Sequence, residues 1–253
     1  CHPKTAQWEG GWSDHRSDPG GPTMGGVTQP PFDEFNDRHG RPRRPVATIT
    51  RMEAEQLFFE QFWLKAGCDR LFPGVDLATY DASVNSGVSR GRKWLLASLD
   101  KRNDHVKTVQ GICRNRLGFV QTLNSLWKSF GKGWSNRIAD IEATGVTWAL
   151  AAMTANDNAK VVTGLRDEQG KAREIAAKQT KGAATSGMSG TGAGAGLTVD
   201  PARLDQAAAW LLGGLMVACL LLGGYLLVRV VINRQREKAY GRVAESLALL
   251  GAV

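Results

Sequence analysis

Two carboxylic acids, a hydroxyl and several glycines lie close together near the start of the sequence, in the stretch WEGGWSDHRSDPGGPTMGGVT (residues 8–28). The first acid, Glu9, lies between Trp8 and a pair of glycines, and Trp12 follows. Aromatic neighbours exclude water from a carboxyl group, and desolvation favours its neutral form. A carboxyl group that keeps its proton near neutral pH can act as a general acid. The stretch therefore indicates acid catalysis by Glu9.

Asp18 and Thr23 complete a candidate catalytic set on the same stretch. Asp18 precedes Pro-Gly-Gly, a polar turn in which we expect its carboxylate to stay hydrated and ionised, and the Thr23 hydroxyl can position a water molecule. An acid, a carboxylate and a hydroxyl on one short loop suit the hydrolysis of a glycosidic bond. Two alternatives stay open: Asp-Pro-Gly-Gly is also ordinary turn chemistry, and Asp14 competes with Asp18 for the second role.

Three further residues are candidates for binding a sugar. Asp81 and Asn85 lie four residues apart on a predicted helix over residues 76–85, so they share one face of it. We expect them to bind sugar hydroxyls from the facing side of a groove, and we count Trp12 with them as a substrate-binding residue. The alternative for Asn85 is that it only caps the helix at the following Ser-Gly break.

The elements that must position these residues are predicted to be mainly α. Apolar residues recur at helical spacing in five segments of the globular part, and no segment alternates long enough to predict a strand. Thr50 and Glu53 form a capping-box pattern at the start of the first of these helices. The five predicted helices cover approximately residues 50–65, 76–85, 89–99, 108–129 and 134–153.

The C-terminal third has a different composition. A charged, alanine-rich helix is predicted over residues 160–181, and the glycine-rich segment 182–196 is typical of a flexible linker. Residues 207–228 contain no charge and, at about 1.5 Å per residue, can cross a hydrocarbon core of ~30 Å. Trp210 and Tyr225 near its ends suit membrane interfaces. A buried globular helix is the alternative interpretation.

The charges that flank this segment predict its orientation. Several basic residues follow it, whereas only Arg203 lies close before it, so the positive-inside rule places the C-terminus in the cytoplasm. We therefore expect a protein of the bacterial inner membrane with its globular part in the periplasm. Pairs of small residues four apart in the segment would allow a weak dimer through the anchor.

Charge and cysteine usage limit the partners. The net charge of +8 favours a polyanionic partner such as the bacterial wall. Nucleic acid is not expected, because no reading helix or base-stacking module is recognisable. The four cysteines form no CxxC pair and the four histidines no HExxH group, so neither a metal site nor a cofactor is expected.

Three blocks of the sequence resemble a known family. EGGWSDHRSDPGGPTMGGVT (residues 9–28) resembles the signature of glycoside hydrolase family 108, which comprises phage-type muramidases and secretion activators. DASVNSGVSRGRKWLLASL (residues 81–99) and FGKGWSNRIADIE (residues 130–142) resemble the start and the end of the predicted peptidoglycan domain that follows in that family. The resemblance implies a compact lysozyme-like fold, cleavage beside N-acetylmuramic acid, Glu9 as catalytic acid, and Asp18 and Thr23 in supporting roles.

Together these patterns predict a peptidoglycan hydrolase made of a lysozyme-like helical domain, a flexible linker and a single C-terminal transmembrane helix. The alternative is a non-catalytic, membrane-anchored scaffold that binds peptidoglycan glycan strands. The sequence predicts a lysozyme-like catalytic region at 1–87 and peptidoglycan-domain helices at 88–156 that complete the globular unit. A charged helix with a glycine-rich linker at 157–206, the transmembrane helix at 207–232 and a cytoplasmic basic tail at 233–253 are predicted to follow.

Overall fold

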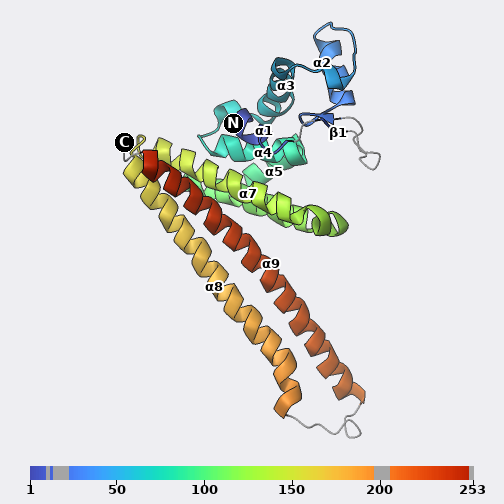
Figure 1. Cartoon of the computed structure of the whole chain (residues 1–253), viewed down its shortest axis with the longest axis vertical. Coiled ribbons are helices and arrows are strands. Elements are labelled where there is room, and N and C mark those ends of the chain that lie inside the picture. Colours follow the sequence, from blue (N-terminus) through green and yellow to red (C-terminus); the bar gives the residue numbers. More distant parts are fainter. Residues whose placement is uncertain (10–11, 14–22, 197–205, 251–253) are drawn as a thin grey trace. The chain divides into compact units, whose positions relative to one another are not determined.

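The computed structural model describes residues 1–9, 12–13, 23–196 and 206–250. The chain divides into two compact units, Cys1–Asp157 and Asn158–Val253, and helices dominate both. The mainly α class predicted from the sequence is therefore confirmed. Figure 1 shows the order of the elements along the chain.

The first unit combines helices with a very small sheet. Three two-residue strands, β1 (Trp12–Ser13), β2 (Thr23–Met24) and β3 (Val27–Thr28), pair antiparallel in the order β1-β2-β3. These strands are too short to show alternation, which is why the sequence did not reveal them. The helices of this unit are α1 (His2–Ala6), α2 (Gln29–Arg38), α3 (Arg51–Phe58), α4 (Val75–Ser86), α5 (Val88–Ser98), α6 (His105–Gln121) and α7 (Asn124–Met153).

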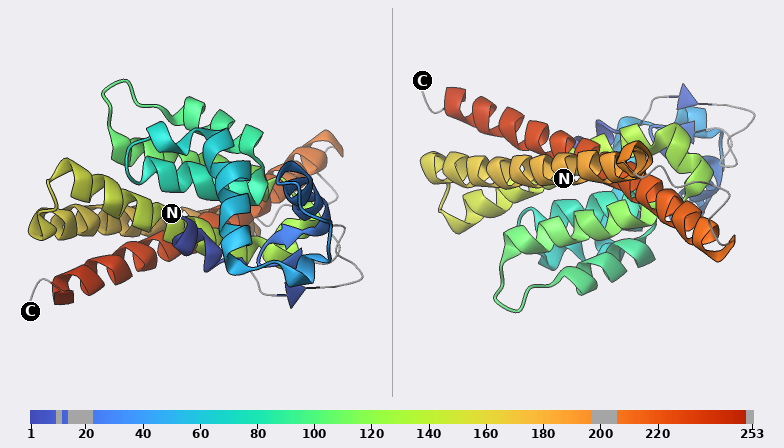
Figure 2. Two further views of the ribbon diagram at one scale, coloured as in Figure 1. Left: turned by 90° about the horizontal axis from the view of Figure 1, so that it is seen from above. Right: turned by 90° about the horizontal axis from the view of Figure 1, so that it is seen from below.

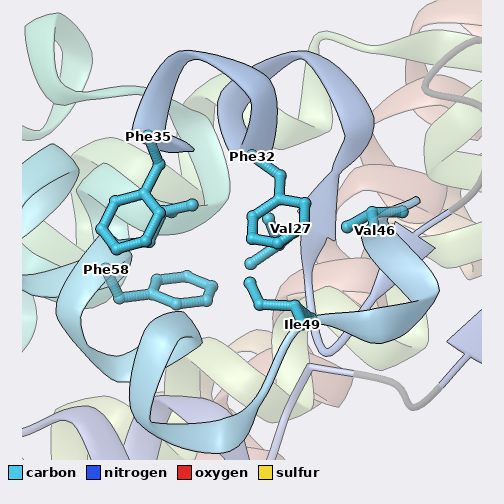
Figure 3. Packing of buried hydrophobic residues seen from close by; sticks show 7 residues of the cluster. Val27, Phe32, Phe35, Val46, Ile49 and Phe58 are labelled. Atoms are coloured by element: carbon cyan, nitrogen blue, oxygen red, sulfur yellow. The ribbon is translucent and has the colours of Figure 1, made fainter. Parts of the chain in front are cut away.

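Phenylalanines hold the small sheet against α2 and α3. Phe32 and Phe35 lie one turn apart on α2 and pack with Phe58 of α3 and with Val27 of β3, all of them buried (Figure 3). A short 3-10 turn over Val46–Thr48 closes the cluster. This core fixes the turn between β2 and β3 relative to the start of α3.

The predicted capping box at the start of α3 is confirmed. The Glu53 backbone N–H donates to the Thr50 hydroxyl at 3.3 Å, and the Glu53 carboxylate accepts from the Thr50 backbone N–H at 2.9 Å. Arg41 and Arg44 also bind this carboxylate. Burial opposes its charged form, but the Thr50 N–H and Arg44 prevail and lower the pKa of Glu53 to about 2. Two arginines of the basic stretch before α3 therefore pair with a carboxylate of the protein itself.

Helices α4 and α7 approach each other closely through two glycines. A Cβ on Gly74, which precedes α4, would lie 2.0 Å from the backbone oxygen of Gly145 on α7. Gly74 also has a φ of +87°, a conformation that favours glycine. The close approach brings side chains of α4 within reach of side chains on α7.

The boundary between α6 and α7 differs from the prediction. The break lies at Thr122 and Leu123, and α7 runs unbroken through residues 130–133, which the sequence left between two helices. Within α7, a Cβ on Gly131 would lie 2.7 Å from the Trp127 ring, and the Ser135 hydroxyl donates to the Gly131 carbonyl. Packing of Trp127 over Gly131 accounts for a glycine inside a helix.

The second unit is a pair of long helices, α8 (Asn158–Gly196) and α9 (Gln206–Leu250), which lie side by side and antiparallel in Figures 1 and 2. The helix predicted over residues 160–181 is confirmed, but it continues to Gly196, through the whole glycine-rich segment 182–196 in which a linker was expected. Gly182 still contacts α9, since a Cβ there would lie 3.3 Å from Leu226. Pairing with α9 therefore extends past the point where composition predicts flexibility.

Candidate functional site

Glu9 lies just beyond α1, where two hydrogen bonds extend the helical turn. Pro3 is tolerated in α1 because it lies in the first turn, where its missing N–H costs nothing. The Trp8 N–H then donates to the Thr5 carbonyl at 3.0 Å and the Glu9 N–H to the Ala6 carbonyl at 3.2 Å. The backbone of Glu9 is thereby fixed by the short helix before it.

Helix α7 holds this segment through two side chains one turn apart. Asp140 accepts from the Trp8 indole N–H at 2.9 Å and pairs with Lys4 at 2.7 Å. Arg137 donates from Nη2 to Oε1 of Glu9 at 2.8 Å. The Trp8 indole is thus hydrogen-bonded to α7, so the residues on both sides of the Trp8–Glu9 peptide bond are tied to the same helix.

A buried ion network lies behind Glu9. Arg137 donates to both oxygens of Asp81 at 3.1 and 2.9 Å, and Arg116 of α6 donates to Asp81 Oδ2 at 2.5 Å. Burial disfavours the charged form of Asp81, but Arg116 and Arg137 outweigh it and hold the pKa of this carboxyl below its ordinary value. Asp81 is therefore a charged anchor for the arginine that holds Glu9.

A glycine turn contacts Glu9 from the opposite side. Gly25 and Gly26, between β2 and β3, have φ values of +56° and +82°. A Cβ on Gly26 would lie 2.8 Å from Glu9 Oε2, whereas a Cβ on Gly25 would meet nothing within 4 Å. Both positions therefore favour glycine because of their positive φ. At Gly26 a side chain would also clash with the Glu9 carboxyl group.

Glu9 forms part of the wall of a groove of about 520 Å³. Its side chain is 20% exposed, so it is partly desolvated and still accessible. The other walls are α1, the β2–β3 turn with Met24 and Gly25, and the start of α3 from Thr50 to Glu55. We call this hollow the Glu9 groove; it lies between the loop region and the helices, as the sequence led us to expect.

The other predicted site residues have different positions. Thr23 is half-buried on β2, beside the groove-lining Met24. Asp18 lies outside the described residues. Trp12 pairs with Met24 through its backbone in β1, and its side chain is likewise outside the description. Asn85 is exposed at the end of α4, where its side-chain oxygen accepts a 3.4 Å hydrogen bond from Ser86, and it does not line the Glu9 groove.

Asp81 needs a correction. It is fully buried, and arginines bind both of its oxygens, so neither is open to a sugar hydroxyl. The four-residue spacing showed which face of α4 carries Asp81, but it did not show that arginines from two distant helices meet that face. The sequence did not identify Arg137 or Gly26 as site residues. For Arg137 a signal was available: it is an arginine beside the buried Ile138 and Ala139 on α7, where a charged side chain needs a buried partner.

Among the residues that the structure describes, no cluster of three or more histidine, cysteine, aspartate or glutamate side chains is arranged to hold an ion.

Asp81→Asn tests whether the network supports the fold. The substitution keeps the shape but leaves two buried arginines with only the Glu9 carboxylate to balance them, so we expect the free energy of unfolding to fall by about 3–5 kcal/mol. Urea denaturation followed by tryptophan fluorescence measures this loss, since seven of the eight tryptophans lie before residue 158. In the wild type, the contribution of Asp81 is full above its unfolded pKa of about 3.9 and is lost as the pH falls through the lower folded value.

Asp69→Asn is the matched control. Asp69 is half exposed and lies 3.9 Å from Arg70, so its loss should change stability by less than about 0.5 kcal/mol. Equal effects of the two substitutions, or an unchanged acid sensitivity in Asp81→Asn, would contradict the anchoring role of Asp81.

Comparison with known proteins relates the first part of the chain to a known family. Residues 2–87 match the sequence model of the family Glycosyl hydrolase 108. The structure resembles that of Brucella abortus SagA, with a TM-score of 0.51 and 26% sequence identity over 58% of this chain and 92% of that chain. No curated protein matches the chain. The family match does not extend to the expected peptidoglycan domain, which stays a prediction. The part of the chain that carries Glu9 is thus similar to a family of glycosyl hydrolases.

Proposed function

We propose that the chain is a peptidoglycan hydrolase of the muramidase type, with Glu9 as its general acid. The observation that carries the proposal is a partly exposed carboxyl group on the wall of a groove, within the segment that matches a glycosyl hydrolase family. The net charge of +8 suits an anionic wall polymer. The alternative, a scaffold that binds glycan strands without cutting them, would need the groove but not the acid.

Arg137 assigns different tasks to the two oxygens of Glu9. It binds Oε1, which leaves Oε2, beside Gly26, to carry the transferred proton. Arg137 also makes two hydrogen bonds to Asp81, so its charge is shared between two carboxylates and holds Glu9 less strongly than an isolated pair would.

In the proposed reaction Glu9 gives its proton to the bridging glycosidic oxygen. The bond between that oxygen and the anomeric carbon breaks, and a water oxygen takes its place at this carbon. The water gives up one proton, to Asp18 where Asp18 holds the water and otherwise to the Glu9 carboxylate, and this restores the charge balance of the site. Asp18, supported by Thr23, holds that water or stabilises the positive charge that develops on the sugar ring. The roles of Asp18 and Thr23 rest on the sequence pattern and on the family resemblance.

Glu9→Gln tests the acid. The amide keeps the shape but has no transferable proton, so clearing of purified cell walls should slow by at least about 100-fold. The measurement is the loss of turbidity of a wall suspension. Glu34→Gln, at a side chain that is 60% exposed on α2, is the control and should clear at the wild-type rate. Equal clearing by Glu9→Gln and wild type would remove Glu9 from the reaction; wall binding without clearing by wild type would favour the scaffold.

Gly26→Ala tests the position of the carboxyl group. The new methyl would displace Glu9, and a shift of about 1 Å in a catalytic group can cost ~100-fold in rate. Gly25→Ala imposes a comparable backbone strain in the same turn without touching Glu9. We expect the clearing rate of Gly26→Ala to fall at least about tenfold below that of Gly25→Ala. Equal rates would show that the contact with Gly26 does not position the acid.

We further propose that α9 anchors the protein in the bacterial inner membrane. Among the described residues, α9 is the one helix long and apolar enough to cross a membrane. A band of its side chains is exposed although apolar, which suits lipid better than water. The residues of this band are Val217, Leu220, Leu221, Leu222, Tyr225, Leu227, Val228 and Val231.

Pairing with α8 alters the expected orientation. Asn233 donates to Gln179 at 3.0 Å and Glu237 lies 4.0 Å from Arg173, so the charged parts of both helices lie at one end of the pair. Towards the other end, α8 has no charge between Lys181 and the end of the helix, and α9 has none before Arg229. We propose that the two uncharged lengths enter the membrane together.

This arrangement bears on the side that the globular unit occupies. Basic residues of both helices gather at the charged end, through which the chain from residue 157 enters α8, and only Arg203 lies between the two helices. The positive-inside rule then favours the cytoplasm for the C-terminus and the globular unit alike, instead of the periplasm expected from α9 alone. The enzyme would be held on the inner face until the membrane is opened.

Fractionation of cells tests the membrane anchor, and protease treatment of spheroplasts tests the side on which the globular unit lies. The full chain should sediment with membranes, and Leu221→Lys should move it to the soluble fraction, because a lysine near the middle of a membrane helix costs about 3 kcal/mol. Leu96→Lys, at an equally exposed leucine of α5, is the control and should stay with the membranes. Protease added to intact spheroplasts should leave residues 1–157 uncut until lysis. Cutting before lysis would show that the globular unit lies in the periplasm.

A further inference from the structure

A second hollow continues the Glu9 groove along α3. Its volume is about 390 Å³, and it shares four lining residues with the groove: His2, Pro3, Arg51 and Glu55. The remaining lining consists of three aromatic side chains, those of Phe59, Trp63 and Tyr80. We call it the aromatic hollow. A long ligand that lies beside Glu9 can extend into it without leaving the surface.

A π-helical turn makes this lining continuous. Arg51, Glu55, Phe59 and Trp63 are spaced four residues apart, and in a regular α-helix each such step rotates the side chain by about 40°. Three steps would turn Trp63 about 120° away from Arg51. The chain instead leaves α3 at Phe58 and forms a π turn over Phe59–Leu64, whose larger number of residues per turn reverses this drift. All four side chains therefore line the hollow. Such turns are rare and are frequent at functional sites.

The aromatic side chains are held in place before any ligand arrives. Tyr80 is buried, and its hydroxyl lies 2.7 Å from Nδ1 of His2. Trp63 packs edge-on against Tyr80 with ring centroids 5.7 Å apart. Phe59 is 50% exposed at the border of the hollow. The hollow thus has a fixed aromatic floor and one large apolar ring open to a ligand.

Polar groups border the aromatic surface on the side of the Glu9 groove. Arg51 donates to Glu55 at 2.8 Å, and both side chains remain accessible, at 87% and 41%. Burial lowers the pKa of His2, so its imidazole is neutral near pH 7 and offers hydrogen bonds without a charge. Apolar walls with a few convergent polar groups are typical of ligand sites.

We propose that the aromatic hollow is a saccharide subsite, which binds sugar rings of the same glycan strand beyond the bond that Glu9 cleaves. Sugar rings have apolar C–H faces that stack on aromatic rings, here Phe59 and Trp63, and hydroxyl edges that suit Arg51 and Glu55. The continuity of the hollow with the Glu9 groove selects the glycan strand as the occupant. The assignment rests on the proposed function for the identity of the polymer.

Binding to purified glycan strands, stripped of their stem peptides, tests the subsite. Phe59→Ala in the full chain should raise the dissociation constant for long strands by about tenfold, and should reduce the gain in affinity from a disaccharide to a long strand. Calorimetry measures both constants. Leu64→Ala removes a comparably exposed apolar side chain from the same π turn, outside the lining, and should bind as the wild type does.

Two further variants separate stacking from folding. Phe59→Tyr keeps the ring and should retain the affinity for long strands, whereas Phe59→Leu keeps apolar bulk without a ring face and should lose it. Equal constants for Phe59→Ala and Leu64→Ala would overturn the subsite. A loss seen only with strands that carry stem peptides would overturn it too, since the hollow would then bind peptide.

The dissociation constants for glycan strands test the subsite separately from the role of Glu9 in catalysis. If Glu9→Gln still cleared walls while Phe59→Ala bound long strands weakly, the acid assignment would fail and the subsite would stand. If Glu9→Gln abolished clearing while Phe59→Ala bound as the wild type does, the reverse would hold.

Discussion

The site depends on one guanidinium group that holds two carboxylates. Arg137 of α7 binds Oε1 of Glu9 at 2.8 Å and both oxygens of Asp81, while Arg116 of α6 completes the charge balance at Asp81. Two cations and two anions in a largely buried cluster approach neutrality, which is the condition under which buried charges are tolerated. The same cluster joins the segment after α1 to α4, α6 and α7. The contacts that fix the position of Glu9 are therefore also contacts that pack the first unit.

This constraint explains why the segment that matches the hydrolase family is not sufficient for the site. The family match ends at residue 87, yet the groups that hold Glu9 and Trp8 are Arg137 and Asp140, fifty residues or more further along the chain. Residues 88–157 therefore contribute directly to the position of the acid. This agrees with the compactness of Cys1–Asp157 as one unit.

The features that the sequence predicted correctly are those that depend on local sequence patterns. The capping box at Thr50 and Glu53, the helical class and a groove beside Glu9 follow from composition, spacing and resemblance. It did not predict what depends on long-range contact. The exposure of Asp81 was misjudged because its partners lie 35 and 56 residues away, and α8 runs past its expected end because α9 packs beside it. The two-residue strands were invisible for a different reason, since a period of two needs several residues to appear.

Three departures from regular local structure lie at the groove. Gly25 and Gly26 adopt positive φ beside the carboxyl group, the π turn over Phe59–Leu64 interrupts the helix that borders it, and the buried ion network lies behind it. Each departure is unfavourable by itself and persists only where the surrounding structure holds it. Their common location fits the proposed binding surface. Glycine opens the turn towards Glu9, the π turn realigns Trp63 with Arg51, and Arg137 fixes the acid between them. The ion network also stabilises the fold, so at Arg137 one side chain serves both the packing of the unit and the position of Glu9.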